Sequence, residues 1–276
     1  MQSNRTISTT ALWRTASWRR ALAIGALLSG HVLVQPASAQ EASDMVDRML
    51  AAHGGMATWK EAPTISFTDE FRPGAAKEGM PSEVTVEQGR RRSYIDYANM
   101  KMSLSWDGEK CWTENWQMPT PPRFLALLNY YFLNLPWLVK DKGVVLGEPG
   151  IERLPNDTAE YISVRMGFES NVGDTPDDYF VLLIDPDTYR LHGCKYVVTY
   201  KDALPEGISS SPEQLLIYDE FVDVEGLKLP SHYTIYDLDN NIYATCAVRD
   251  WSLQRPFDES RMEMSNTAVL DLSKPK

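Results

Sequence analysis

The chain has 276 residues, and its 38 acidic residues outnumber the 27 basic ones, for a net charge of −11. This balance excludes the broad basic face that binding of nucleic acid requires. Three cysteines, Cys111, Cys194 and Cys246, permit at most one disulfide, which excludes a disulfide-dense scaffold. A chain of this length forms one large domain or two small ones, and its core can be large enough to contain an apolar cavity.

The first 39 residues have the pattern of an export signal. An apolar run over 21–34 follows four arginines, and the small residues Ala37-Ser38-Ala39 form a cleavage site. We therefore expect an exported protein cleaved after Ala39, with a net charge of −15 once the four arginines are removed from the −11 of the whole chain. Arg19-Arg20 matches a twin-arginine signal only in part, so the general secretory route is favoured.

Two short helices are expected at the start of the mature chain. Apolar residues share one helical face over 41–55, Ser43 or Asp44 supplies the N-cap, and Gly54-Gly55 ends the helix. His53, directly before these glycines, suits the position of a cation at the negative end of the helix dipole. A second amphipathic turn covers 56–60.

Most of the remaining chain alternates like antiparallel strands, with one helical segment between them. The expected strands are 64–71, 82–88, 90–97, 101–106, 110–116, 144–146, 160–168, 179–184, 190–200, 214–221, 227–236 and 242–253. Strands and helices do not alternate, which favours a mainly β fold in which an antiparallel sheet is closed or half closed on itself. The segment 205–212 is expected to be a loop within the sheet, and the polar tail from Glu259 to fray.

Asp107-Gly108 predicts a tight hairpin between two of these strands. The pair suits a type I′ turn, whose two central residues both need a positive φ. The hairpin would bring Trp106 near Trp112, with Cys111 on the opposite face of the sheet from Trp112.

The segment 121–140 predicts the central helix. Pro121 and Pro122 suit its first turn, and Pro136 should end or kink it. One apolar stripe at helical spacing contains Phe124, Leu127, Leu128, Tyr131, Phe132 and Leu135. The uncharged run of 16 residues, 124–139, is shorter than the roughly 20 that span a bilayer, so we expect a helix enclosed by the curved sheet.

The candidate site is the apolar surface between this helix and the sheet. Its expected lining is the helical stripe together with Trp106, Trp112 and Trp137, and the same residues could instead simply fill a core. The basic run Arg90-Arg91-Arg92 has two interpretations, a contact to a lid or head group and a strand face in water.

Catalytic and metal sites find little support. His53, His192 and His232 are far apart and belong to no catalytic motif, and His192 with Cys194 lacks a third group. Oxygen ligands at Asp174, Asp177 and Asp178 would suit a hard cation, but a solvated turn is favoured. We predict no catalytic residue, no metal and no cofactor.

Several short segments together resemble a known family. They are Gln88-Gly89-Arg90-Arg91-Arg92, Ser105-Trp106-Asp107-Gly108 leading to Trp112, 52–55, 130–136, 173–179 and 184–188. The chain from about Ser43 to Phe257 is similar to the periplasmic outer-membrane lipoprotein carrier (LolA-like) superfamily, in a less characterised branch.

The resemblance implies a half-barrel of about eleven strands, capped by helices, whose apolar concave face holds acyl chains. It implies a periplasmic carrier of a lipid or lipoprotein that meets membrane-bound donors or acceptors transiently, with Arg91 or Arg92 holding the lid. Two alternatives remain, because a fold does not fix a function. They are an enzyme acting on an apolar substrate in the same pocket, and an envelope interaction protein whose helix is a permanent plug.

Overall fold

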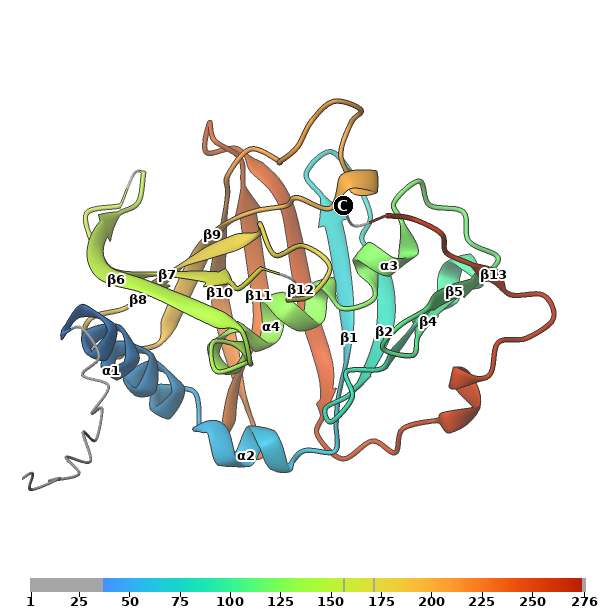
Figure 1. Cartoon of the computed structure of the whole chain (residues 1–276), viewed down its shortest axis with the longest axis horizontal. Coiled ribbons are helices and arrows are strands. Elements are labelled where there is room, and N and C mark those ends of the chain that lie inside the picture. The colour runs from blue at the N-terminus through green and yellow to red at the C-terminus, as the bar shows by residue number, and fades with distance from the viewer. Residues whose placement is uncertain (1–36, 156, 171, 275–276) are drawn as a thin grey trace, which may run out of the picture. The chain divides into compact units, whose positions relative to one another are not determined.

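One long antiparallel sheet organises the protein. The computed structural model describes residues 37–274 except 156 and 171, so most of the predicted export signal lies outside the described residues. Thirteen strands pair in the order β13-β5-β4-β3-β2-β1-β12-β11-β10-β9-β8-β7-β6. β13 and β6 lie at opposite ends of this order, so the sheet is open, as a half-barrel is (Figure 1).

All strands except β13, which lies in the tail that was expected to fray, lie close to where the alternation predicts them. They are β1 (Thr64–Pro73), β2 (Met80–Glu87), β3 (Ser93–Tyr97), β4 (Met102–Trp106), β5 (Cys111–Glu114), β6 (Val144–Arg153), β7 (Glu160–Phe168), β8 (Tyr179–Ile184), β9 (Leu191–Val197), β10 (Gln214–Val224), β11 (Leu227–Tyr236), β12 (Ile242–Ser252) and β13 (Val269–Leu270). The predicted antiparallel, mainly β fold is confirmed. The largest error is at β6, which is much longer than the predicted 144–146.

The β4–β5 hairpin is confirmed, but the predicted type I′ turn is wrong. Trp106 pairs with Cys111, so the loop has four residues, and the Asp107 carboxylate accepts hydrogen bonds from the backbone N–H groups of Glu109 and Lys110. Only Gly108 in this loop has a positive φ. An Asx-type turn therefore replaces the tighter one.

A turn with two positive φ values occurs instead between β10 and β11. Val224 pairs with Leu227, and Glu225 and Gly226 between them have φ values of 50° and 89°. Gly54 at the end of the first helix approaches this turn so closely that an added Cβ would lie 2.1 Å from the Gly226 carbonyl oxygen. A glycine is therefore required at position 54.

The prediction that Trp106 and Trp112 lie together on the cavity side of the sheet is wrong. Trp106 pairs directly with Cys111, and these two side chains belong to the main core. Because successive strand residues face opposite sides, Trp112 lies on the other face, next to Leu270 of β13.

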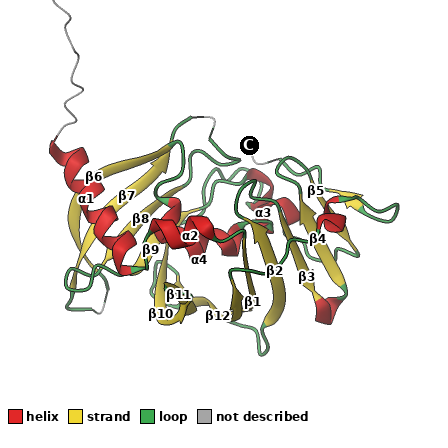
Figure 2. Ribbon diagram, turned by 90° about the horizontal axis from the view of Figure 1, so that it is seen from below, coloured by secondary structure: helices red, strands yellow, loops and turns green. Residues whose placement is uncertain are grey.

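Four helices cover the inner side of the sheet: α1 (Ala37–Ala52), α2 (Met56–Glu61), α3 (Pro122–Leu125) and α4 (Leu128–Leu138). Figure 2 shows α2, α4 and α3 following one another across the strands. α1 begins before the predicted caps, so Ser43 and Asp44 lie inside the helix instead of at its N-terminus. Gly54 and Gly55 end it as predicted, both with positive φ.

His53 is buried and neutral, so the predicted cation at the helix end is wrong. Its Nδ1–H donates to the Lys228 carbonyl oxygen at 3.0 Å, while its Nε2 accepts from the Leu191 N–H at 3.0 Å. Burial lowers the pKa of His53 to about 4. The ring thus ties the end of α1 to β11 and β9.

The central helix is broken, but not at the predicted proline. The chain leaves helical geometry at Leu127, and the Ala126 carbonyl at the break accepts a hydrogen bond from Ser93 Oγ at 2.7 Å. Pro122 stands in the first turn of α3 as predicted. Pro136 was predicted to end or kink the helix; it lies inside α4, so it does not end the helix.

The sheet provides the partner that Pro136 cannot. An α-helix normally bonds the N–H of residue 136 to the Phe132 carbonyl, and proline has no N–H. The Tyr218 hydroxyl of β10 donates to that carbonyl instead. The proline therefore leaves no orphan acceptor inside the core.

The C-terminal half of α4 is held inside the sheet on every side. Leu133, Leu135, Trp137 and Leu138 are all 0% exposed. Trp137 stacks on Trp59 of α2, and its Nε1 donates to the Gly55 carbonyl at 2.9 Å. This half of the helix is a fixed part of the core.

The polar tail does not fray as expected. The two terminal guanidinium nitrogens of Arg261, Nη1 and Nη2, each donate to an oxygen of the Asp96 carboxylate at 2.8 Å. Farther along, β13 pairs with β5, and the Asp271 N–H donates to the Cys111 carbonyl at 2.8 Å. The tail therefore completes one edge of the sheet.

Within the described residues, none of the helices has both the length and the apolar character that crossing a bilayer requires.

Tyr218→Phe tests the support of the helix by the sheet. Loss of the hydroxyl leaves the Phe132 carbonyl buried without a partner, which costs about 1–3 kcal/mol of unfolding free energy in urea denaturation. Tyr243→Phe, at a side chain 55% exposed, is the control and should change little.

Pro136→Ala added to Tyr218→Phe should recover most of this loss, because alanine restores the N–H that bonds the Phe132 carbonyl. If Pro136→Ala has the same effect with and without the hydroxyl, the two residues do not act on the same carbonyl.

Candidate functional site

Two cavities lie on either side of α3 and the first turns of α4. Their volumes are about 400 Å³ and about 900 Å³. Phe124, Leu128 and Phe132 of these helices line both, as do Tyr196 and Val198 near the end of β9. A thin apolar wall, contributed mainly by the broken helix, therefore divides the space beneath the sheet into two compartments.

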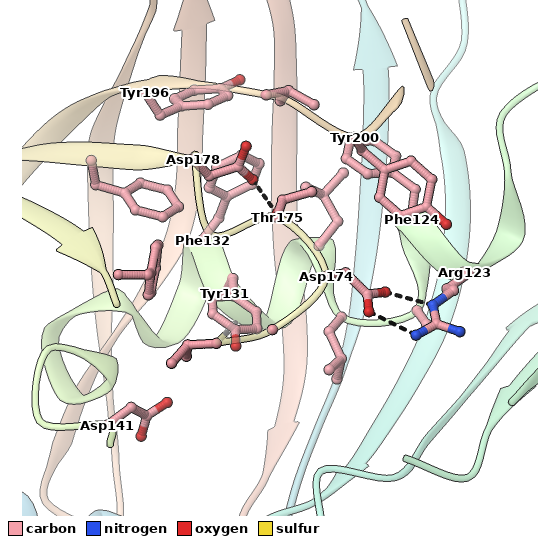
Figure 3. Close-up of a pocket in the computed structure, with 18 of the residues that line it drawn as sticks. Arg123, Phe124, Tyr131, Phe132, Asp141, Asp174, Thr175, Asp178, Tyr196 and Tyr200 are labelled. Carbon is pink, nitrogen blue, oxygen red and sulfur yellow. Dashed lines mark hydrogen bonds and ion pairs between the residues drawn. The ribbon is translucent and has the colours of Figure 1, made fainter. Parts of the chain in front are cut away.

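Arg123 holds the smaller cavity closed at one side. Arg123 Nε donates to one carboxylate oxygen of Asp174 at 2.5 Å, and Nη2 donates to the other at 2.7 Å (Figure 3). Its guanidinium also lies 4.6 Å from the centre of the Trp106 ring. The bidentate pair connects α3 to the loop between β7 and β8, and the ring contact connects it to β4.

The larger cavity opens beneath the connection from β9 to β10. Ile208 on this loop, Leu238 on the β11–β12 turn and Tyr243 on β12 line the cavity and are 49%, 71% and 55% exposed. Phe71, Met80 and Leu125 extend the apolar lining inward. An apolar rim therefore leads from the surface into an apolar interior.

A polar network stands in the wall of the larger cavity. Asp69 of β1 is 1% exposed and accepts hydrogen bonds from Ser82 of β2 and from the side chain of Asn129 on α4. Asn129 in turn accepts from the Tyr233 hydroxyl at 2.9 Å. The first turn of α4 is therefore bonded directly to β1 and β11, and through Asp69 to β2.

Burial raises the pKa of Asp69 to about 6, because the ionised carboxylate loses most of its hydration. The hydrogen bonds from Ser82 and Asn129 oppose this shift, since they favour the charged form. A buried carboxyl with a strongly shifted pKa in a cavity wall is a common property of functional sites.

Six of the nine side chains predicted to line an apolar cavity do line one. Trp106, Leu127 and Tyr131 line the smaller cavity, and Phe124, Leu128 and Phe132 line both. Two others, Leu135 and Trp137, are completely buried in the core and line neither. The ninth, Trp112, lies on the opposite face of the sheet.

The basic run is a turn between β2 and β3 rather than part of a strand. Arg91, with a φ of 55°, donates to Asp141 after α4 at 2.8 Å and lies over the rings of Tyr130 and Trp59. Arg92 is buried and pairs with Glu87 and Glu259. Both arginines bind parts of the protein itself, and neither lines the two cavities described above.

Two features of the larger cavity were missed in the sequence. Asp69 alternates with Phe67 and Phe71 in β1, so a carboxylate on the inward face of a strand was the signal for the network. The loop 205–212 was recognised, but its position over a cavity depends on the order of the strands, which the residues do not state.

The predicted acidic cluster is occupied by protein contacts. Asp174 pairs with Arg123, and Asp178 accepts from the hydroxyls of Thr175 and Thr199. Across the part of the chain that the structure describes, no cluster of three or more His, Cys, Asp or Glu side chains could hold a metal ion.

The three cysteines are buried and free. Cys194 belongs to the main core, whereas His192 stacks on Tyr161 of a smaller cluster. A shift in the β8–β9 register at His192 separates the two residues, so they do not form a pair.

No family model matches the sequence, and no curated protein matches it. Among solved structures, a DUF1329 family protein from Desulfovibrio piger has a TM-score of 0.52 at 9% identity, over 82% of this chain and 97% of that one. A LolA superfamily protein from Nitrosomonas europaea has a TM-score of 0.47 at 11% identity, over 82% and 97%. The fold is the open half-barrel that the sequence predicted; identities this low show the fold alone.

Asp69→Asn tests the buried carboxyl. The pKa of Asp69 is higher in the folded chain, about 6, than its ordinary value of 3.8, so its ionisation destabilises the fold as the pH rises through this window. The unfolding free energy of the wild type minus that of Asp69→Asn should fall by up to about 3 kcal/mol between pH 4 and pH 7. Urea denaturation at several pH values measures the difference.

Asp223→Asn is the control, since its side chain is 69% exposed and distant from the network. A difference between wild type and Asp69→Asn that does not change with pH would contradict a raised pKa for Asp69.

Proposed function

We propose that this protein is a periplasmic binding or carrier protein that holds the acyl chains of a lipid or lipoprotein in its half-barrel. The observation that carries the proposal is the larger cavity, which has about 900 Å³ of space between the sheet and the broken helix, an apolar lining and an open rim. Ligand pockets for small molecules commonly measure about 300–1,000 Å³. The predicted export signal supports the periplasmic location.

Acyl chains suit this cavity because the free energy gained by burying apolar surface adds up along the chain. Each buried CH₂ contributes about 0.8 kcal/mol, so a chain of roughly 16 carbons gains on the order of 10 kcal/mol relative to water. The exposed rim residues Ile208, Leu238 and Tyr243 offer such a chain apolar contact before it leaves the aqueous phase.

Binding does not require the whole central helix to leave. The C-terminal half of α4 is fixed in the core, whereas Phe124 and Leu128, on α3 and at the start of α4, are half-buried and already line space. A ligand can therefore enter beside α3 and the start of α4, and a small displacement of these segments tunes its affinity.

The alternative of a pocket enzyme has one observation in its favour, the shifted pKa of the buried Asp69. The described lining of the two cavities contains no histidine and no cysteine, so a general base at Asp69 would have neither as its partner. Binding is the function that the geometry supports better.

Native mass spectrometry of the exported protein, purified without detergent, tests the proposal. We expect an acyl-bearing ligand at near one per chain, identified after organic extraction. Leu128→Arg should abolish its retention, because Leu128 belongs to the wall of both cavities and a charge there is costly to bury.

Ile151→Arg is the matched control, because Ile151 lies on β6 and is 64% exposed. This variant should retain the ligand as the wild type does. An apo mass that stays unchanged after incubation with phospholipid and with lipopeptide would exclude the carrier function.

A further inference from the structure

The two cavities differ in the charges of their walls. The larger cavity is lined by three carboxylates, Asp69, Glu213 and Asp237, and its described lining contains no lysine, arginine or histidine. The smaller cavity has Arg123 and Lys142 in its wall. Only the larger cavity therefore presents charge of a single sign to a bound molecule.

Asp69 is the carboxylate placed to meet the polar end of a ligand. It lies in the buried wall among Phe71, Met80 and Ser82, whereas Glu213 and Asp237 are half-buried. Its two known donors are Ser82 and Asn129. An ionised carboxylate offers about four acceptor sites, so capacity for further donors remains.

The other two carboxylates are held in place by the protein. Glu213 accepts a hydrogen bond from the Tyr179 hydroxyl at 2.8 Å, and Asp237 accepts from the backbone N–H groups of Asp239 and Asn241. Neither has an ion-pair partner among the described residues. Their negative charge therefore faces the cavity uncompensated by a salt bridge.

We infer that the larger cavity selects amphiphiles whose polar end is an amine or another cation and rejects those whose polar end is anionic. The inference rests on the proposed function, since it concerns the ligand of the same cavity. A cationic end gains a charge-assisted contact with Asp69. An anionic end would be repelled by three carboxylates in a region of low dielectric, which is selection by repulsion as well as attraction.

The selectivity should depend on the protonation of Asp69. Other groups around it are Tyr97, Tyr233 and Cys246, whose pKa values are all raised by burial, and Arg249 on β12. Glu213 and Asp237 line the same cavity, and the pKa of Asp237 is lowered by its turn hydrogen bonds. As the pH falls through about 6, Asp69 becomes neutral and its attraction for a cation is lost.

The experiment compares three probes that share a twelve-carbon alkyl chain, namely dodecylamine, dodecanol and dodecanoate. Each is added to the delipidated protein at neutral pH, below its critical micelle concentration. Displacement of a bound fluorescent lipid reports their affinities. We expect dodecylamine to bind at least about tenfold more tightly than dodecanoate, with dodecanol between them.

Asp69→Asn should abolish most of the preference for the amine, measured as the ratio of dodecylamine affinity to dodecanol affinity, because asparagine keeps the shape of the side chain without its charge. Asp223→Asn, at the exposed carboxylate outside both cavities, should behave like the wild type. On the wild type itself, the ratio of amine to alcohol affinity should fall as the pH is lowered from about 7.5 to 5, which tests the inference without any substitution.

The outcomes separate the two proposals. If all three probes bind with equal affinity, or the carboxylate binds most tightly, the carrier function stands and the selectivity is overturned. A preference for the amine that persists unchanged in Asp69→Asn overturns the role of Asp69. If none of the probes displaces the fluorescent lipid and that lipid itself does not bind, both proposals fail.

Discussion

The structure depends on burying one end of a helix inside a curved sheet without leaving a polar group unpaired. Half of α4 is enclosed on all sides, and its proline removes the hydrogen bond that the Phe132 carbonyl would have made. Strand side chains supply hydrogen bonds to polar groups of the helix. The Tyr218 hydroxyl donates to the Phe132 carbonyl, and the Tyr233 hydroxyl donates to the Asn129 side chain. In the described residues, no buried side-chain polar atom lacks a hydrogen-bond partner. The core can therefore accept an aromatic helix with a proline in it.

This anchoring leaves only the other end of the helical segment free to border empty space. The break at Leu127 turns α3 away from the line of α4, so that Phe124 and Leu128 face cavities instead of packing into a continuous stripe. The segment around the break therefore borders both cavities, while the C-terminal half of α4 is fixed in the core. One helical segment thus serves both a stable core and a candidate ligand site.

The sequence was sufficient for the sheet and insufficient for the site because the two depend on interactions of different range. Alternation in segments such as 160–168 and 227–236 is local, and the structure has strands with those bounds. The break at Leu127 depends on Ser93, which is distant in sequence, and the fate of Pro136 depends on Tyr218. Helical spacing predicts that Leu135 shares a face with the lining residues, but it does not say what covers that face, and Leu135 is fully buried in the core.

Two buried titratable groups make the fold less sensitive to moderate acid than either group alone would. Burial lowers the pKa of His53 from 6.5 to about 4, so acid destabilises the fold as the unfolded chain takes up this proton. Burial raises the pKa of Asp69 from 3.8 to about 6, so acid stabilises the fold through this group. Each shift corresponds to about 3 kcal/mol, with opposite signs over nearly the same pH range. The contributions of His53 and Asp69 to the unfolding free energy therefore oppose one another across that range, so the buried histidine offsets part of the pH dependence that a carboxylate in the wall of an apolar cavity introduces.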